Sequence, residues 1–310
     1  MNTITNKIVF VLAFAASILL AGCTKPEKKL DIQAYQKEIQ QWQQERSTRL
    51  QREDGWLTLI GLFWLKEGEN KFGSDTTNEI VFPPGKSLGV AGSIFFEKGA
   101  LRITAEREAG IFCNDSVVTA MPILSDGEGK TDPTILKLNT LLFYVIKRGE
   151  QYGVRLKDKE SPARMNFKGL EYFPVAEKWR VEATFEPYTP AKKLAILNQV
   201  GTTSNDSCPG ALAFEVDGKQ YRLDVIIETP GDKEFFIMFT DETSGKETYG
   251  NGRQLYSGFP DANGKVILDF NKAYNWPCVF TPFATCPIPP RQNHLAVRVE
   301  AGEKMYEEHF

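Results

Sequence analysis

The sequence predicts a mainly β protein, with a sandwich, roll or barrel-like β core preceded by one N-terminal amphipathic helix. Short runs of β-branched and aromatic residues alternate with turn residues after Leu65, as the strands of an all-β domain require. Two glycine-containing turns, at 148–150 and 217–219, link such runs in the manner of hairpins. Apolar residues at helical spacing are largely confined to residues 31–55. Together these observations favour the mainly β class.

Residues 1–22 have the pattern of a secretory signal peptide. Lys7 supplies the positive charge, and the apolar stretch that follows is too short to span a bilayer. That stretch ends in Leu20-Ala21-Gly22-Cys23, which matches the bacterial lipobox. We therefore expect cleavage before Cys23, a lipid on its thiol, and a charged tether over residues 23–30. The alternative is a short buried helix that ends in a cysteine.

A lipid at Cys23 would place the protein in the cell envelope, with the membrane as a partner through that anchor. Thr24, rather than Asp, follows the cysteine. By resemblance to Gram-negative lipoproteins, this residue favours the outer membrane.

The segment 31–55 is expected to form the amphipathic helix. Asp31 can accept hydrogen bonds at its N-terminus, and Gly55 is suited to end it. The apolar residues that form one stripe at spacings of three and four are Ile32, Tyr35, Ile39, Trp42 and Leu50. We expect this stripe to pack on the β core, with binding of a partner as the alternative.

A β-rich domain is expected from residue 56 to 310. Its first ten residues, 56–65, are strongly apolar and predict a buried strand or turn. Two prolines within 187–193 mark a possible junction between two β units. The segments that read as further strands are 79–82, 93–97, 101–106, 141–147, 151–156, 179–185, 211–216, 220–227, 234–239, 265–270 and 295–299.

Composition excludes several classes of function. The net charge of −3 gives no basic footprint for nucleic acid. The two histidines, His294 and His309, are too few for a His-rich zinc site, so we expect no metal and no cofactor. A Ser-His-Asp triad would have to use His294, and the sequence has no Gly-Xaa-Ser-Xaa-Gly motif.

Polar residues gather near the C-terminus and suggest a ligand-binding site. Asp269 and Asn271 would point to the same face of a strand. Five prolines between 277 and 290 would stiffen an aromatic loop that could wall a pocket. The candidate ligand-binding residues are Tyr249, Arg253, Asp269, Asn271, Tyr274 and Asn275. The alternative is that Arg253 and Asp269 form a structural pair, with the loop as a plug on the β core.

Cys278 and Cys286 are expected to form a disulfide. Seven residues separate them, prolines bend the chain between them, and the envelope is oxidising. Two buried free thiols are the alternative. Cys113 and Cys208 are expected to remain free.

Several motifs resemble those of the DUF1684 family of uncharacterised bacterial and archaeal proteins. The motifs that carry the resemblance are Asp54-Gly55-Trp56-Leu57, Gly61-Leu62-Phe63-Trp64-Leu65, Phe167-Lys168-Gly169-Leu170, Thr248-Tyr249-Gly250-Asn251-Gly252-Arg253, residues 268–275 and the proline-rich segment 276–290. The resemblance supplies no activity.

Three functions remain open from the sequence. The first is binding of a small polar molecule or glycan in the cell envelope, since the candidate residues suit hydrogen bonding and stacking. The second is a structural or assembly role through the N-terminal helix and residues 56–65. The third is a metal-independent hydrolase that works through carboxylates such as Asp269.

Overall fold

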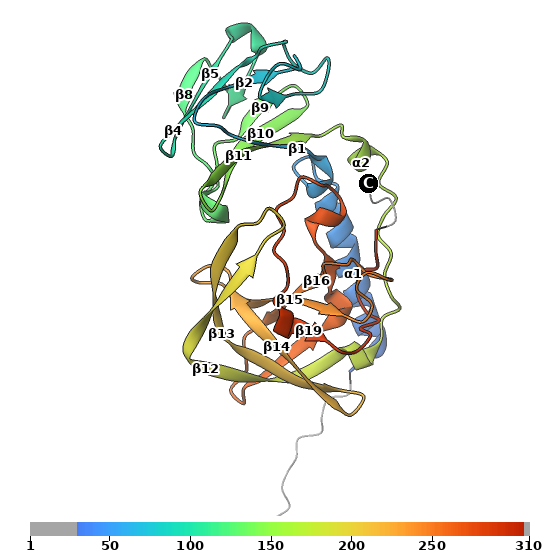
Figure 1. Ribbon diagram of the computed structural model, residues 1–310. Coiled ribbons are helices and arrows are strands. Elements are labelled where there is room, and N and C mark those ends of the chain that lie inside the picture. Colours follow the sequence, from blue (N-terminus) through green and yellow to red (C-terminus); the bar gives the residue numbers. More distant parts are fainter. Residues whose placement is uncertain (1–29, 307–310) are drawn as a thin grey trace, which may run out of the picture.

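The computed structural model describes residues 30–306 and contains one long helix and three β-sheets (Figure 1). The predicted signal peptide, Cys23 and most of the tether lie outside the described residues. None of the described helices has the length and apolar character needed to cross a membrane.

The N-terminal β unit consists of two sheets. The first has the strand order β1 (Leu59–Trp64), β11 (Gln151–Asp158), β10 (Leu141–Arg148), β9 (Leu136–Leu138), β6 (Phe112–Cys113) and β7 (Ser116–Val117). The second has the order β3 (Ile80–Val81), β2 (Gly68–Gly73), β4 (Gly92–Glu97), β5 (Ala100–Ala105) and β8 (Ala120–Pro122). Phe72, Phe82 and Phe143 pack together in the core between them.

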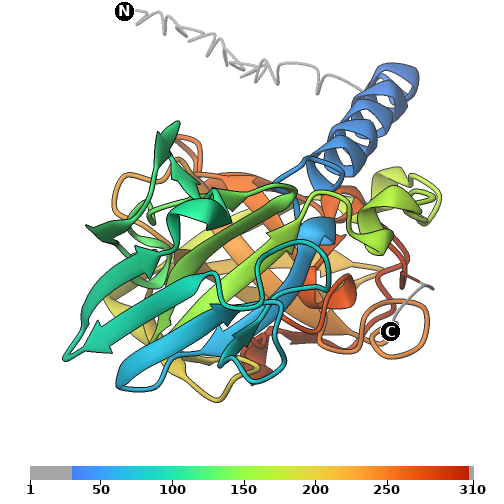
Figure 2. The same ribbon diagram turned by 90° about the horizontal axis from the view of Figure 1, so that it is seen from above.

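The C-terminal β unit is built on one larger sheet. Its order is β17 (Lys265–Asp269), β12 (Arg180–Leu197), β13 (Thr203–Val216), β14 (Lys219–Ile227), β15 (Glu234–Asp241), β16 (Arg253–Gly258) and β18 (Tyr274–Asn275), with β19 (His294–Leu295) parallel to β15. Trp179, Phe239 and Phe270 belong to its core. Seen from above, the strands of the N-terminal unit lie over this second unit (Figure 2).

The predicted hairpins form as expected. Val216 pairs with Lys219 across Asp217-Gly218, and both turn residues have positive φ. This is the two-residue turn whose twist matches that of the flanking strands. Arg148 likewise pairs with Gln151 across a two-residue loop. The mainly β class is therefore confirmed, although the strand orders of the described residues are open and close no barrel.

The boundary between the two units differs from the prediction. Residues 187–193 lie inside the long strand β12, whose pairing with β13 is interrupted there by a shift in register. The prolines therefore disturb the ladder without ending the strand. The chain passes between the two cores earlier, between β11 and β12, through a segment that contains the short helix α2 (Pro162–Met165).

The predicted strand 295–299 is also shorter than expected. The structure has strand pairing only at His294–Leu295. Beyond it, the carbonyl of Val297 accepts one backbone hydrogen bond, from Glu242. Val299 bonds to side chains: its backbone N–H donates to Asp241 and its carbonyl accepts from Arg253.

Helix α1 (Ile32–Leu50) begins at the predicted cap, where the Asp31 carboxylate accepts a hydrogen bond from the backbone of Ala34. Tyr35, Ile39 and Leu50 are buried, whereas Ile32 at the outer end is 40% exposed. The apolar stripe therefore packs the helix along the C-terminal unit (Figure 1).

Buried polar contacts fix α1 to the C-terminal unit. The Tyr35 hydroxyl donates to the Asp269 carboxylate at 2.8 Å. The Arg46 guanidinium pairs with Glu303 at 2.9 Å, with both side chains buried. Burial and the Asp269 charge raise the pKa of Tyr35, so its hydroxyl remains a donor.

Replacing Tyr35 with Phe should lower the free energy of unfolding by about 1.5–3 kcal/mol, because a buried carboxylate loses a donor. Urea denaturation measures this change. Tyr152→Phe is the control, since no described residue bonds its hydroxyl, and it should change stability by less than about 0.5 kcal/mol. Equal effects of the two variants would show that the Tyr35 contact does not hold the helix.

Candidate functional site

A cavity of about 940 Å³ lies between the two β units, with α1 at one side. Residues from both units and from the helix line it. The lining residues include Arg46, Trp56, Asp126, Arg148, Arg155, Glu228, Phe236, Tyr256, Tyr274, Trp276 and Thr285. We call this cavity the inter-unit cleft.

Aromatic side chains form one wall of the inter-unit cleft. The Phe236 ring lies 5.1 Å from that of Tyr256 and 5.9 Å from that of Trp276, centroid to centroid. The Arg46 guanidinium lies 4.6 Å from the ring centroid of Tyr274. This wall offers flat apolar faces together with hydroxyl groups, a combination that suits stacking of a polar ring.

Glu228 lies at the rim of the aromatic wall and accepts a hydrogen bond from the Tyr256 hydroxyl at 2.7 Å. Desolvation raises the pKa of Glu228, the hydrogen bond from Tyr256 partly offsets this, and the charges of Asp232 and Asp206 also raise it. The carboxyl group is therefore easier to protonate than an ordinary glutamate.

The opposite wall carries guanidinium groups. Arg148 pairs with Asp126 at 2.8 Å and also donates to the Thr285 hydroxyl at 3.0 Å. Arg155 donates to the same hydroxyl at 3.0 Å and is only 6% exposed. Burial lowers the pKa of Arg155, and the positive charge of Arg148 lowers it as well.

Arg253, a predicted ligand contact, is the first residue of β16 and is buried, with 0% exposure. It pairs with Asp241 at 3.3 Å, not with Asp269. Its guanidinium also donates to the carbonyls of Val299, at 2.9 Å, and Ala301. These bonds favour the alternative of a structural role for Arg253. Its ion-pair partner is Asp241 on the adjacent strand β15, and the prediction of Asp269 as the partner was wrong.

Asp269 and Asn271 are together, as predicted, but they face helix α1. Asn271 donates to the Tyr35 hydroxyl at 2.8 Å and to the carbonyl of Ala176 at 3.0 Å. Its backbone N–H and side-chain amide both donate to Asp269. Every one of these contacts joins parts of the scaffold.

The remaining candidates separate. Asn275 is fully buried and donates to the carbonyl of Lys304 at 2.7 Å. The Tyr249 hydroxyl accepts from Gln199 at 3.1 Å and from Asn251 at 3.3 Å. Of the six predicted ligand-binding residues, Tyr274 is the one that lines the inter-unit cleft.

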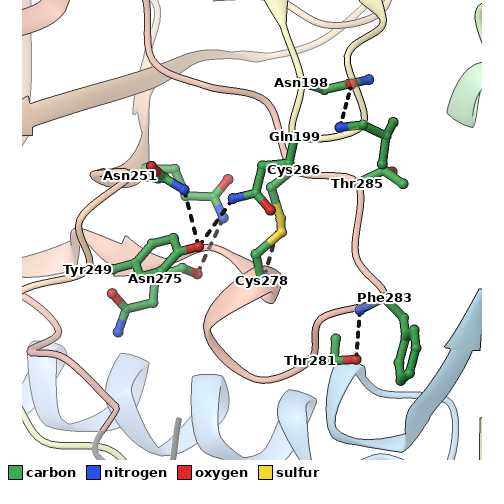
Figure 3. The surroundings of a disulfide bond; sticks show 12 residues. Asn198, Gln199, Tyr249, Asn251, Asn275, Cys278, Thr281, Phe283, Thr285 and Cys286 are labelled. Carbon is green, nitrogen blue, oxygen red and sulfur yellow. Dashed lines mark hydrogen bonds between the residues drawn. A yellow bond between two sulfur atoms is a disulfide. The ribbon is translucent and has the colours of Figure 1, made fainter. Parts of the chain in front are cut away.

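The disulfide between Cys278 and Cys286 is present, with a Cα–Cα distance of 6.3 Å, and Cys113 and Cys208 are free. Figure 3 shows the disulfide beside Gln199 and Tyr249. The proline-rich loop reaches the inter-unit cleft through Trp276, Pro277, Thr285, Cys286 and Pro287. The predicted wall thus lies at a cavity, although most of the residues predicted for its floor lie elsewhere.

Arg155 and Lys157 were not predicted from the sequence. Both lie on β11, on the face opposite Val154 and Leu156, which belong to the core. Cationic residues that alternate with apolar ones along a hairpin strand are expected on the face exposed to solvent. The side chains of Arg155 and Lys157 are nevertheless only 6% and 8% exposed. No local pattern in the sequence distinguishes them from surface charges.

Comparison with known proteins supports the family resemblance for one part of the chain. Residues 165–304 match the family model described as "Protein of unknown function (DUF1684)". This range covers most of the C-terminal unit and leaves out the motifs between residues 54 and 65. No curated protein matches the sequence.

Among solved structures, the chain is similar to the solution NMR structure of an uncharacterized protein from Haloarcula marismortui. The two sequences are 29% identical, and the alignment covers 47% of this chain and 82% of that chain with a TM-score of 0.40.

Replacing Arg253 with Ala should lower the free energy of unfolding by about 3–5 kcal/mol, since Asp241 would remain as a buried unpaired charge. Guanidinium denaturation measures the loss. Arg298→Ala removes an arginine whose pairs with Glu247 and Glu300 are exposed, and it should cost less than about 1 kcal/mol. An Arg253→Ala protein as stable as the wild type would restore Arg253 as a candidate ligand contact.

Proposed function

We propose that the protein binds a small polar molecule or glycan in the inter-unit cleft. The observation that carries this proposal is a cavity of about 940 Å³ between two β units, with an aromatic wall facing a wall of guanidinium groups. Ligand sites in proteins commonly have volumes of about 300–1,000 Å³ and combine aromatic surface with a few polar groups.

The polar lining suits recognition of hydroxyl-rich ligands. Asn198, Thr203, Ser204 and Gln254 line the cleft and provide both donors and acceptors. Sugar rings need such groups at their edges and an apolar surface at their faces. Phe236 and Tyr256 offer that surface close to Gln254, which lies on the same strand as Tyr256.

Carboxylate-based hydrolysis is a second candidate, favoured by the raised pKa of Glu228 in the cleft. We rank it below binding because the Tyr256 hydroxyl already donates to one oxygen of that carboxylate. Asp269, the carboxylate named from the sequence, bonds to Tyr35 and Asn271 and takes no part in the cleft.

An assembly role through residues 56–65 has less support. Leu57 and Leu59 of this segment are 1% and 3% exposed and belong to the protein's own cores. The same holds for Tyr35, Ile39 and Leu50 on the apolar stripe of α1. These apolar groups pack within the chain and are not available to a partner.

Tyr256→Ala should weaken ligand binding, because it removes a flat face and the donor to Glu228. Thermal shift of the protein against neutral sugars, sugar acids and sugar phosphates measures binding. Phe259→Ala is the control: this ring is 44% exposed, packs on Phe235 and does not line the cleft. Stabilisation by no compound, or equal loss in both variants, contradicts the proposal.

We also propose that the protein is a lipoprotein of the cell envelope, anchored through Cys23 and located in the outer membrane of a Gram-negative cell. The lipobox Leu20-Ala21-Gly22-Cys23 supports this proposal. Asp31 caps helix α1 soon after the predicted tether, so the folded part would begin close to the anchor.

Mass spectrometry of the N-terminus from bacterial membranes should find a diacylglyceryl group on Cys23 and none of residues 1–22. Cys23→Ser should move the protein from the detergent phase to the aqueous phase in Triton X-114 partitioning. An unmodified Cys23 after expression in a bacterium that processes lipoproteins contradicts the anchor.

A further inference from the structure

We infer that Arg155 and Lys157 form an anion-binding subsite that takes a carboxylate or phosphate group of the ligand. This inference rests on the proposed function and deepens it, because it assigns a charge to the bound molecule. The subsite lies on the outer face of β11, at the edge of the inter-unit cleft.

Both cations are buried without a carboxylate partner. Arg155 and Lys157 are 6% and 8% exposed, and across residues 30–306 neither forms an ion pair. Lys157 donates to the carbonyl of Asp54, and Arg155 donates to the Thr285 hydroxyl. The Nε of Arg155 has no hydrogen-bond partner. Buried arginines and lysines are rarely left unpaired in proteins, so these two suit an external anion.

Two acids lie near the pair, but neither forms an ion pair with Arg155 or Lys157. Asp126 is bound to Arg148 at 2.8 Å, and Asp54 is bound to Arg52 at 2.9 Å. Each of these acids already has its own cation, which leaves two positive charges in excess beside each other on one strand.

A second cavity, of about 790 Å³, extends over the same face of the sheet. Asp126 and Arg155 line both cavities, so the two meet at this point. Lys157 lies 5.6 Å and Arg155 5.2 Å from the ring centroid of Trp56. A ligand in the inter-unit cleft can therefore place an anionic group between the cations while its remainder contacts the aromatic wall.

The pKa of Lys157 suits a group that would bind an anion. Burial, and then the charge of Arg155, lower the pKa of Lys157 to about 8, while Asp54 raises it. The other charged or titratable groups that line this second cavity are Glu53, Asp126, Lys137, Tyr144 and Lys159, and the ammonium of Lys157 lies 5.8 Å from the ring centroid of Tyr144. A bound anion would favour the ammonium form and raise this pKa.

The two cations suit oxyanions in particular. A guanidinium presents a planar set of donors that matches two oxygens of a carboxylate or phosphate, and an ammonium adds a compact charge. The same chemistry serves a sugar acid and a sugar phosphate, so the probes must separate the two sources.

The test is titration calorimetry of the folded protein with inorganic phosphate and, separately, with acetate. At least one should bind, and both Arg155→Gln and Lys157→Gln should weaken it by about tenfold or more. Arg102→Gln and Lys71→Gln change exposed cations of the same unit and should leave the affinity unchanged. Tighter binding of phosphate points to a phosphorylated ligand, and tighter binding of acetate to a carboxylated one.

A second measurement uses the wild-type protein and needs no substitution of a buried residue. In the wild type, NMR of ¹³C-methylated lysines should show the Lys157 pKa rising when the bound anion is added. The affinity for the anion should also fall as the pH rises through about 8, which is the pKa of Lys157 without a bound anion. The reason is that the ammonium form of Lys157 is the one that binds. An unshifted Lys157 pKa, or unchanged affinity in both glutamine variants, overturns the subsite.

The two proposals fail separately. If neutral sugars bind and lose affinity in Tyr256→Ala while neither anion binds, the anion subsite is overturned and the cleft function stands. If phosphate binds through Arg155 and Lys157 but no larger polar molecule does, the subsite stands and the cleft function is overturned.

Discussion

The buried ion pair between Asp241 and Arg253 is the interaction on which the arrangement of the C-terminal unit depends. Arg253 holds the carbonyls of Val299 and Ala301, and Asp241 accepts from the Val299 backbone. This fixes the chain leading to Glu303, which binds Arg46 of α1. Two buried charged side chains thus order a chain segment that has little strand pairing. Buried charges of this kind are stable only when they are paired and hydrogen-bonded.

Glu303 extends this network to the inter-unit cleft. Its carboxylate accepts from the backbone of Asn275 at 2.8 Å, and Asn275 pairs with Arg253 across strands β18 and β16. Tyr274, the neighbour of Asn275, reaches the cleft and carries the Arg46 guanidinium on its ring. A continuous set of bonds therefore holds together the helix, the C-terminal segment and one wall of the cleft. Such a rigid arrangement suits a binding site that is formed before the ligand binds.

The parts of the fold that depend on local chemistry could be predicted from the sequence. The cap at Asp31, the turn at Asp217-Gly218 and the Cys278–Cys286 disulfide each follow from nearby residues. The partner of Arg253 could not be predicted, because ion pairs between strands depend on register and topology. The burial of Arg155 could not be predicted either. The alternation of residues along β11 assigns its side chain to solvent, and the side chain is buried only because the two units pack together.

The central claim is that the space between the two β units holds a small molecule. The most direct measurement is a crystal structure of the protein purified from its own cells, without added ligand. We expect electron density for a bound small molecule in the cleft, in contact with Tyr256 and with Arg155. Density from ordered water alone, in a crystal where the two units keep this arrangement and no lattice neighbour enters the cleft, would contradict it.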